Sequence, residues 1–204
     1  PLSRAIIEID FCIANLNLPR GPFGYACKDP AKVTVDDFVF TGFRGGKSSI
    51  ANNIFGYNST RAFVNRFPGL NGLGLSMTRI DYEVGGVAPL HSHRTSEVLL
   101  LTKGKLIAGV IDTNNTAYYK RLVAGDVMVF PPFLLHFHIN VGKTPALAFL
   151  TFNSANPGVK ITSAALFAGN MPAEIAEKTT LISREEVIRL KKIFGGNGAA
   201  SNTL

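Results

Sequence analysis

Two short blocks of this chain hold all four of its histidines, GVAPLHSHRTSEVLLLTKG (86–104) and GDVMVFPPFLLHFHIN (125–140). The first block also carries Glu97. Three imidazoles, those of His91, His93 and His136, together with the Glu97 carboxylate form a ligand set for a divalent first-row metal. Such a set leaves coordination positions open for water or a substrate. The blocks therefore predict a reactive metal centre. A lone histidine is more often a structural residue, so the argument depends on the whole set.

The spacing of these residues restricts the fold. Residues two apart on a strand share a face, so His91 and His93 can bind one ion together. On a straight strand, Glu97 would lie roughly 13 Å beyond His93, too far to share that ion. We therefore expect a turn over 94–96, with Glu97 entering on the next strand. His136 must return from a distant strand, as it does in a small closed barrel or a jelly roll.

The rest of the chain predicts an all-β fold with a short helical extension. β-Branched and aromatic runs follow one another from about residue 73 to 167, separated by Gly, Pro or Asn. The runs are LGLSMTRIDYEV, SEVLLLT, KLIAGVI, TAYYKRL, DVMVF, LLHFHIN, ALAFLTF and VKITSAALF. We assign residues 33–169 to a β-barrel domain, and residues 1–32, rich in Gly and Pro, to an N-terminal arm.

The pattern changes after residue 169. A helix is expected near Pro172, which suits a first turn. A second helix is expected after the capping box from Ser183 to Glu186, and it should end at Gly195. Residues 170–194 thus form a helical extension with an apolar face that would pack on a second subunit or on the barrel itself. Residues 195–204 are expected to be disordered.

The two cysteines, Cys12 and Cys27, are interpreted as one disulfide that staples the arm. Free buried thiols or a catalytic cysteine are the alternatives. Sequons at Asn58 and Asn114 favour N-glycosylation and the secretory route. The chain begins at Pro1 without a leader-like segment, which we interpret as a processed, mature form.

Composition narrows the possible partners. The formal net charge is +7, but the basic residues are scattered and not interleaved with aromatic residues, which argues against nucleic-acid binding. No apolar run approaches the roughly 20 residues that a membrane helix needs. The basic surface would suit acidic polysaccharides of a cell wall.

The chain resembles the plant germin-like proteins of the cupin superfamily over about residues 10–194. The resemblance is carried by DFCIANL, VTVDDFVF (33–40), FPGLNGLGLSMTRIDY (67–82), the two histidine blocks and SANPG (154–158). It implies a jelly-roll barrel, a trimer of dimers joined through the C-terminal helices, and secretion to the apoplast. It also implies Mn²⁺, or another divalent first-row metal, on His91, His93, Glu97 and His136, and a disulfide between Cys12 and Cys27.

Several positions depart from the family pattern. Three residues separate His93 from Glu97 where most germin-like proteins have four. Phe133 replaces a glycine, so it would reshape the barrel mouth or fill the pocket. His138 replaces a glutamine and should point inward, as a partner of the ligands, a proton shuttle or an inert buried histidine. Thr78 and Ala88 stand where oxalate oxidases carry asparagines, which argues against that activity.

Three functions remain open. The leading hypothesis is a manganese-dependent superoxide dismutase. The second is an isomerase, cyclase or lyase of specialised metabolism, in which His138 and Phe133 would be catalytic residues acting on a small-molecule substrate. The third is a non-enzymatic storage, auxin-binding or wall-binding protein. A cysteine protease is disfavoured because both thiols are expected to be paired.

Overall fold

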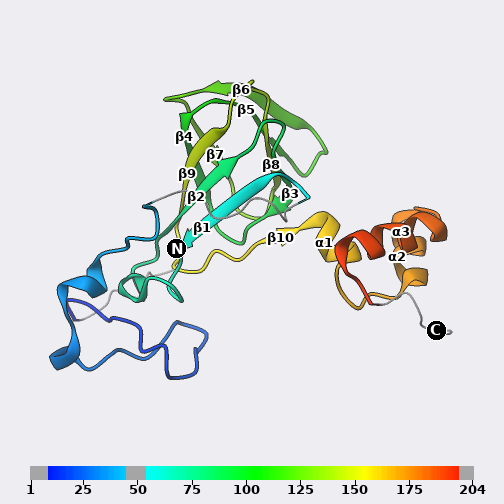
Figure 1. The fold of residues 1–204 in the computed structure, drawn as a ribbon. Coiled ribbons are helices and arrows are strands. Elements are labelled where there is room, and N and C mark those ends of the chain that lie inside the picture. The colour runs from blue at the N-terminus through cyan, green and yellow to red at the C-terminus, as the bar shows by residue number, and fades with distance from the viewer. Residues whose placement is uncertain (1–8, 45–53, 198–204) are drawn as a thin grey trace.

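A computed structural model of the 204-residue chain describes residues 9–44 and 54–197. The described part centres on a jelly-roll barrel made of two antiparallel five-stranded sheets (Figure 1). The first sheet has the strand order β1-β2-β9-β4-β7 and the second has β10-β3-β8-β5-β6. The strands are β1 (Tyr57–Ala62), β2 (Ser76–Tyr82), β3 (Val87–Ser92), β4 (Glu97–Lys103), β5 (Lys105–Ile111), β6 (Ala117–Val123), β7 (Val127–Phe130), β8 (Leu135–Asn140), β9 (Ala146–Phe152) and β10 (Lys160–Ile161). The expected all-β jelly roll is confirmed.

The barrel interior follows from the alternation of side chains along the strands. On β4, for example, Glu97, Leu99 and Leu101 are buried while the residues between them are exposed. β2 and β8 alternate in the same way, so each strand sends every second side chain inward. The apolar core is closed by aromatic side chains such as Tyr82 and Phe130, both fully buried. The functional side chains therefore lie on the same inward rows as the core.

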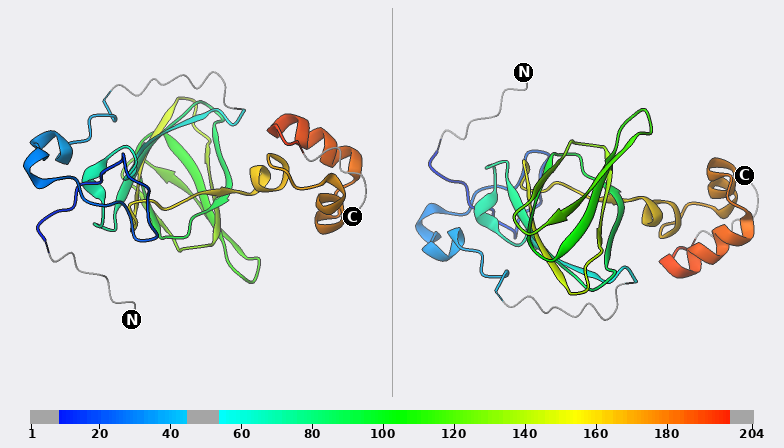
Figure 2. Two further views of the ribbon diagram at one scale, coloured as in Figure 1. Left: turned by 90° about the horizontal axis from the view of Figure 1, so that it is seen from below. Right: turned by 90° about the horizontal axis from the view of Figure 1, so that it is seen from above.

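The N-terminal segment lies at one end of the molecule and the C-terminal helices at the other (Figure 2). Cys12 and Cys27 form a disulfide, as expected. Short 3₁₀ turns follow it at η1 (Pro30–Lys32) and η2 (Val35–Phe38), and a further one, η4 (Pro68–Leu70), lies before β2. The Asn71 amide donates to the Tyr25 carbonyl (2.9 Å) and its carbonyl accepts from the Tyr25 N–H (3.1 Å). These bonds tie the disulfide loop to the barrel.

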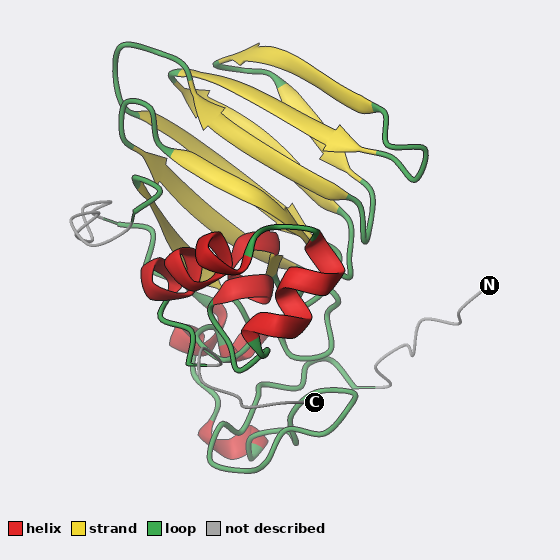
Figure 3. Ribbon diagram, turned by 90° about the vertical axis from the view of Figure 1, so that its right-hand side faces the viewer, coloured by secondary structure: helices red, strands yellow, loops and turns green. Residues whose placement is uncertain are grey.

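Three helices follow the barrel: α1 (Thr162–Phe167), α2 (Ala173–Thr180) and α3 (Arg184–Phe194) (Figure 3). The Ser183 hydroxyl accepts from the Glu186 N–H, and α3 ends at Gly195 with φ 76°, both as the sequence predicts. Pro172 caps α2 rather than lying inside its first turn.

Helix α1 corrects the sequence prediction that strand continues through residue 167. Only Lys160 and Ile161 pair with β3, and the next six residues are helical. The small residues of this segment fit either structure, and packing decides, because Phe167 is buried against α2 and α3. The prediction of disorder over 195–204 falls largely outside the described residues. None of the described helices is long and apolar enough to cross a bilayer.

Candidate metal centre

The predicted ligands come from both sheets and from the turn that joins them. His91 lies on β3 and pairs with His136 on β8. The chain leaves β3 after Ser92, turns, and re-enters as β4 at Glu97. The shortened spacing between His93 and Glu97 is thus accommodated by a turn between the two sheets. His93 lies at the start of this turn, where its side chain remains 8% exposed.

The structure brings one nitrogen or oxygen atom from each of these four residues to within 4.8 Å of the others. Glu97 Oε2 lies 3.1 Å from His93 Nε2 and 3.5 Å from His136 Nε2. All four side chains are buried. Ligand atoms at these separations can surround a single ion, because metal–ligand bonds to nitrogen and oxygen are about 2.0–2.2 Å long.

Backbone carbonyls orient the three imidazoles. Nδ1 of His91 forms a hydrogen bond with the Pro89 carbonyl at 2.7 Å, and Nδ1 of His136 forms one with the Leu134 carbonyl at 2.9 Å. Nδ1 of His93 bonds the Gly158 carbonyl. A carbonyl accepts only from an N–H, so in neutral imidazoles the proton lies on Nδ1 and the lone pair on Nε2. The Nε2 atoms that face one another are therefore the ones prepared to ligate.

The centre contains polar atoms that the described protein does not satisfy. Both Glu97 carboxylate oxygens and Nε2 of His136 are buried without a hydrogen-bond partner. Leaving such groups unpaired in a barrel core is costly, and a cation bound between them would remove that cost. The donor set, with three imidazole nitrogens and one carboxylate, suits Mn²⁺, Fe²⁺ or Zn²⁺. The residues thus fit a resident divalent metal.

Burial and mutual charge set the protonation of the site. Burial, reinforced by His136 and His138, lowers the pKa of His91 to about 3. Burial alone would raise the pKa of Glu97, but the nearby imidazoles of His136, His93 and His138 outweigh it and hold that pKa below its ordinary value. At neutral pH the site therefore holds a neutral His91 beside a carboxylate, the forms that bind metal.

His138 points inward, as expected, and lies beside the ligands. Its side chain is fully buried, Nδ1 lies 3.0 Å from the Tyr82 hydroxyl, and Nε2 lies 3.6 Å from Glu97 Oε1. Burial lowers the pKa of His138 to about 4. It also raises the pKa of Tyr82 well above its ordinary value, helped by the Glu97 charge. His138 is thus a neutral imidazole between a phenol and the free side of the ligand carboxylate.

Phe133 does not fill the pocket. It keeps a φ of 68°, the left-handed value that a glycine would favour, and its N–H donates to the His93 carbonyl at 2.7 Å. Its side chain is 72% exposed and lies over a surface hollow beside Arg94 and Pro157. The structure therefore places Phe133 against the backbone of a ligand and away from the ligand cluster.

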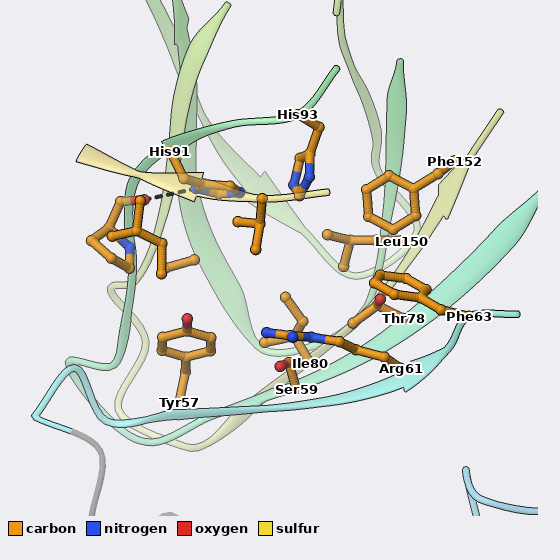
Figure 4. Close-up of a pocket in the computed structure, with 14 residues that line it drawn as sticks. Tyr57, Ser59, Arg61, Phe63, Thr78, Ile80, His91, His93, Leu150 and Phe152 are labelled. Carbon is orange, nitrogen blue, oxygen red and sulfur yellow. Dashed lines mark hydrogen bonds between the residues drawn. The ribbon is translucent and has the colours of Figure 1, made fainter. Parts of the chain in front are cut away.

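A small pocket of about 50 Å³, partly open to solvent, reaches the centre from the side of β1 (Figure 4). His91 and His93 form one end, and side chains of β1, β2 and β9 form the walls. The pocket is mostly apolar, and among the described residues that line it Arg61 is the one cationic side chain. Thr78 and Ala88, which stand at the oxalate-oxidase asparagine positions in the resemblance, both line it. The side chains of Tyr57 and Arg61 extend into it opposite the histidines.

Sequence reasoning missed several residues of this site. Tyr57, Ser59 and Arg61 line the pocket, but their strand lies in a stretch that the sequence marks only as a mixture of short runs and loops. Their alternation at positions 57, 59 and 61 is the available signal. Tyr82 could have been found as an inward position of a predicted strand. The role of the Gly158 carbonyl could not have been predicted from the sequence, because every residue carries a backbone carbonyl.

The remaining predicted sites lie at the surface or in the arm. Asn114 is exposed in the loop between β5 and β6, and Asn58 is partly exposed on β1. Cys12 and Cys27 are the two cysteines of the chain and are bonded to each other, which leaves no thiol for nucleophilic catalysis.

Comparison with known proteins gives a consistent picture. The cupin family model matches residues 46–188. A germin-like protein, subfamily 3 member 3, of Arabidopsis thaliana is 48% identical over 188 residues, which cover 92% of this chain and 88% of that protein. An auxin-binding protein, ABP20, of Prunus persica is 47% identical over 195 residues, with coverage of 95% and 90%.

Solved structures agree with the fold. An oxalate oxidase structure superposes with a TM-score of 0.86 at 31% identity, covering 92% of this chain and 96% of that chain. Peruvianin-I, described as a cysteine peptidase from Thevetia peruviana latex, gives a TM-score of 0.74 at 37% identity, with coverage of 78% and 98%. The similarity therefore extends over the barrel and beyond it.

Proposed function

The chain belongs to the germin-like proteins of the cupin family, and we propose that it is a secreted manganese-dependent superoxide dismutase. The observation that carries the proposal is the cluster of buried, unsatisfied ligand atoms around Glu97 at the end of a pocket. A redox metal held there would supply one-electron exchange with a small anion.

The protein's own residues would perform three tasks. His91, His93 and His136 present fixed Nε2 lone pairs, since a backbone carbonyl holds each Nδ1 proton. Glu97 adds one negative charge, which offsets part of the ion's charge. The pocket reaches the centre at His91 and His93, so a small anion that enters through it would meet these two side chains before Glu97.

Attraction of the anion follows from charge. The chain carries a formal net charge of +7, and Arg61 lines the approach to the histidines. A positive potential along the approach raises the rate at which superoxide arrives, and this effect weakens as salt screens it. Oxalate is disfavoured, because Ala88 offers no side-chain donor and Thr78 offers a single hydroxyl where a dianion needs several contacts.

A second candidate function rests on the apolar lining of the pocket. Superoxide needs no such lining, whereas a metal-assisted isomerase, cyclase or lyase acting on an apolar metabolite would. A binding protein without catalysis would use the same surface, and the Prunus persica relative bears the name of an auxin-binding protein. In this candidate His138, which is fully buried beside Glu97, positions the carboxylate and does not touch the substrate.

The proposal extends to assembly and location. We expect a trimer of dimers in which α2 and α3 make subunit contacts, and their exposed Leu181 (93%) would lie in such a contact. The disulfide suits the oxidising apoplast, and glycans on Asn58 and Asn114 would suit passage through the secretory route. The excess of basic residues favours retention on acidic wall polysaccharide.

Elemental analysis and a superoxide assay on the natively purified protein test the function. We expect about one manganese per chain and dismutation that His91→Ala abolishes together with the metal. His138→Gln, which removes a neighbour of Glu97 that is outside the ligand set, should keep the metal. Protein that carries manganese but does not dismutate superoxide would contradict the proposed activity. Turnover or retention of an apolar metabolite by that protein would then support the second candidate.

A further inference from the structure

Two hollows on the surface share Arg94, a residue of the turn between β3 and β4. The arm hollow, of about 590 Å³, lies between residues 20–24 of the N-terminal arm and the barrel. The barrel hollow, of about 290 Å³, lies between Phe133 and residues 157–160. Because one arginine lines both, the two hollows adjoin and together form an elongated groove. The groove lies outside the pocket that ends at His91.

One backbone segment, residues 154–160, contributes to the lining of both hollows. Arg94 is held against this segment. Its backbone N–H donates to the Pro157 carbonyl and its guanidinium donates to the Asn156 carbonyl, both at 3.4 Å. A Cβ placed on Gly158 would lie only 3.2 Å from the guanidinium carbon, so the arginine crosses the segment at this glycine. These contacts fix Arg94 at the junction of the two hollows.

The groove is basic. Arg20 lines the arm hollow, Lys160 lines the barrel hollow, and Arg94 lies between them. All three residues are exposed, and none takes part in an ion pair within the part of the chain that the structure describes. Neither hollow has an Asp or Glu among its described lining residues. Cations without a counter-charge along a groove favour a ligand that carries several separated anionic groups.

Each hollow also presents an aromatic ring to solvent. Phe23 is 98% exposed, in a turn closed by the bridge between Gly21 and Gly24, and Phe133 is 72% exposed. Covering such a ring removes apolar surface from water, and the negative face of the ring attracts C–H groups. One face of a sugar ring presents C–H groups, while its hydroxyls need hydrogen-bonding partners such as the Asn156 amide in the arm hollow. The groove thus alternates groups that suit a carboxylate with groups that suit a sugar face.

We propose that this groove binds an acidic polysaccharide, whose uronate carboxylates pair with the three cations and whose sugar faces pack on the two phenylalanine rings. A uronate chain repeats one carboxylate and one ring face in every sugar, which matches this alternation. Nucleic acid also combines anions with rings, but the disulfide of the arm suits an oxidising compartment, where acidic glycans are the expected polyanions. The inference rests on the wall retention in the proposed function and gives that retention a specific surface.

Fluorescence anisotropy with a dye-labelled galacturonate oligomer tests the proposal on the intact protein. We expect Arg94→Gln to lower the affinity about ten-fold, because it removes a charge-assisted contact that both hollows share. Arg20→Gln and Lys160→Gln should each lower it about three-fold, since each acts in one hollow. Phe23→Ala should lower it several-fold through the lost ring contact. Arg94→Lys, which keeps the charge, should bind more tightly than Arg94→Gln.

Two further probes separate charge from length. A methyl-esterified oligomer lacks the anions, and free galacturonate occupies one hollow alone. Both should bind at least about ten-fold more weakly than the acidic oligomer. Arg121→Gln is the matched control, because Arg121 is an exposed arginine on β6 outside both hollows, and it should keep the parent affinity. Each variant is checked for an unchanged melting temperature.

Parent-like affinity in Arg94→Gln would overturn the proposal, and so would the absence of oligomer binding at millimolar concentration. Equal losses in Arg94→Gln and Arg121→Gln would assign the binding to net charge instead of the groove. Tighter binding of an oligothymidylate than of the galacturonate oligomer would make nucleic acid the ligand. The assay involves neither manganese nor superoxide, so protein that dismutates superoxide without binding the oligomer loses only this proposal.

Discussion

The Tyr82 hydroxyl lies 3.0 Å from Nδ1 of His138, and both side chains are fully buried in the barrel. His138 in turn approaches the Glu97 oxygen that faces away from His93 and His136. Burial keeps Tyr82 protonated, so its hydroxyl is available to donate to the imidazole. That donation leaves the His138 proton on Nε2, directed toward the ligand carboxylate.

Replacing this phenol should destabilise the protein. Tyr82→Phe removes the hydroxyl and leaves Nδ1 of His138 unsatisfied in the core, at a cost of about 1–3 kcal/mol in the free energy of unfolding. Urea unfolding monitored by circular dichroism measures the change. Tyr119→Phe on β6, where the side chain is 67% exposed, should have no measurable effect. Equal stability of the two variants would show that the buried bond contributes nothing.

The metal-free protein should lose stability as the pH falls below about 6.5. Burial lowers the pKa of His91 to about 3 and that of His138 to about 4, whereas an unfolded histidine titrates near 6.5. Between these values the unfolded chain binds protons that the folded chain does not, so unfolding becomes easier as acid is added. Each histidine contributes roughly 1.4 kcal/mol per pH unit over its window.

The check is a series of urea unfolding curves from pH 7.5 to 4 in the presence of a chelator. His138→Gln should show a shallower decline, because one of the two titrating groups is gone. A decline of equal slope in both proteins would contradict the role of His138. A free energy of unfolding that stays constant from pH 6.5 to 4 would contradict the lowered pKa values of both His91 and His138.

Metal removal should destabilise the folded protein. An ion that binds the folded state alone, at a free concentration 100 times its dissociation constant, contributes about 2.7 kcal/mol. Thermal unfolding with and without chelator should show this difference for the parent protein and for Arg121→Met, which changes an exposed arginine on β6. His136→Ala should show no response to chelator, because it removes one of the four ligand side chains. A chelator response that survives in His136→Ala would place the ion elsewhere.

Phe133→Gly should stabilise the protein. Phe133 holds a φ of 68°, a region that costs a residue with a Cβ about 1–2 kcal/mol, and its exposed ring loses little packing when it is removed. The greater freedom of glycine in the unfolded chain offsets part of the gain, so we expect about 0.5–1 kcal/mol. Phe133→Ala retains the backbone cost and should show no gain. Equal melting temperatures for the Gly and Ala variants would refute the argument.

The barrel was predictable because its strands are short, rich in β-branched and aromatic residues, and separated by Gly, Pro and Asn. The four ligands were predictable as residue types, since a turn over 94–96 is the simplest way to bring Glu97 beside His93, and the structure has that turn. The hydrogen-bond partners of the ligands were not predictable. The Gly158 carbonyl lies 65 residues from His93, and only the tertiary fold brings the two together.

The prediction for residues 162–167 was wrong for a related reason. Ala164 and Ala165 favour helix whereas Thr162 favours strand, so the local preference is mixed, and contact with α2 and α3 makes the segment helical. Arg61 was missed because a basic residue near the start of a barrel ordinarily faces water. Its inward position became clear only from its pairing with Thr78.

The carbonyl of Gly158 has a mechanical consequence. It fixes the His93 ring, and the same stretch of backbone continues through β10 into the helical extension. A displacement of those helices would therefore act, through two residues of strand, on the orientation of the His93 ring. If subunits contact one another through the helices, their packing would be linked to this imidazole through a single peptide oxygen.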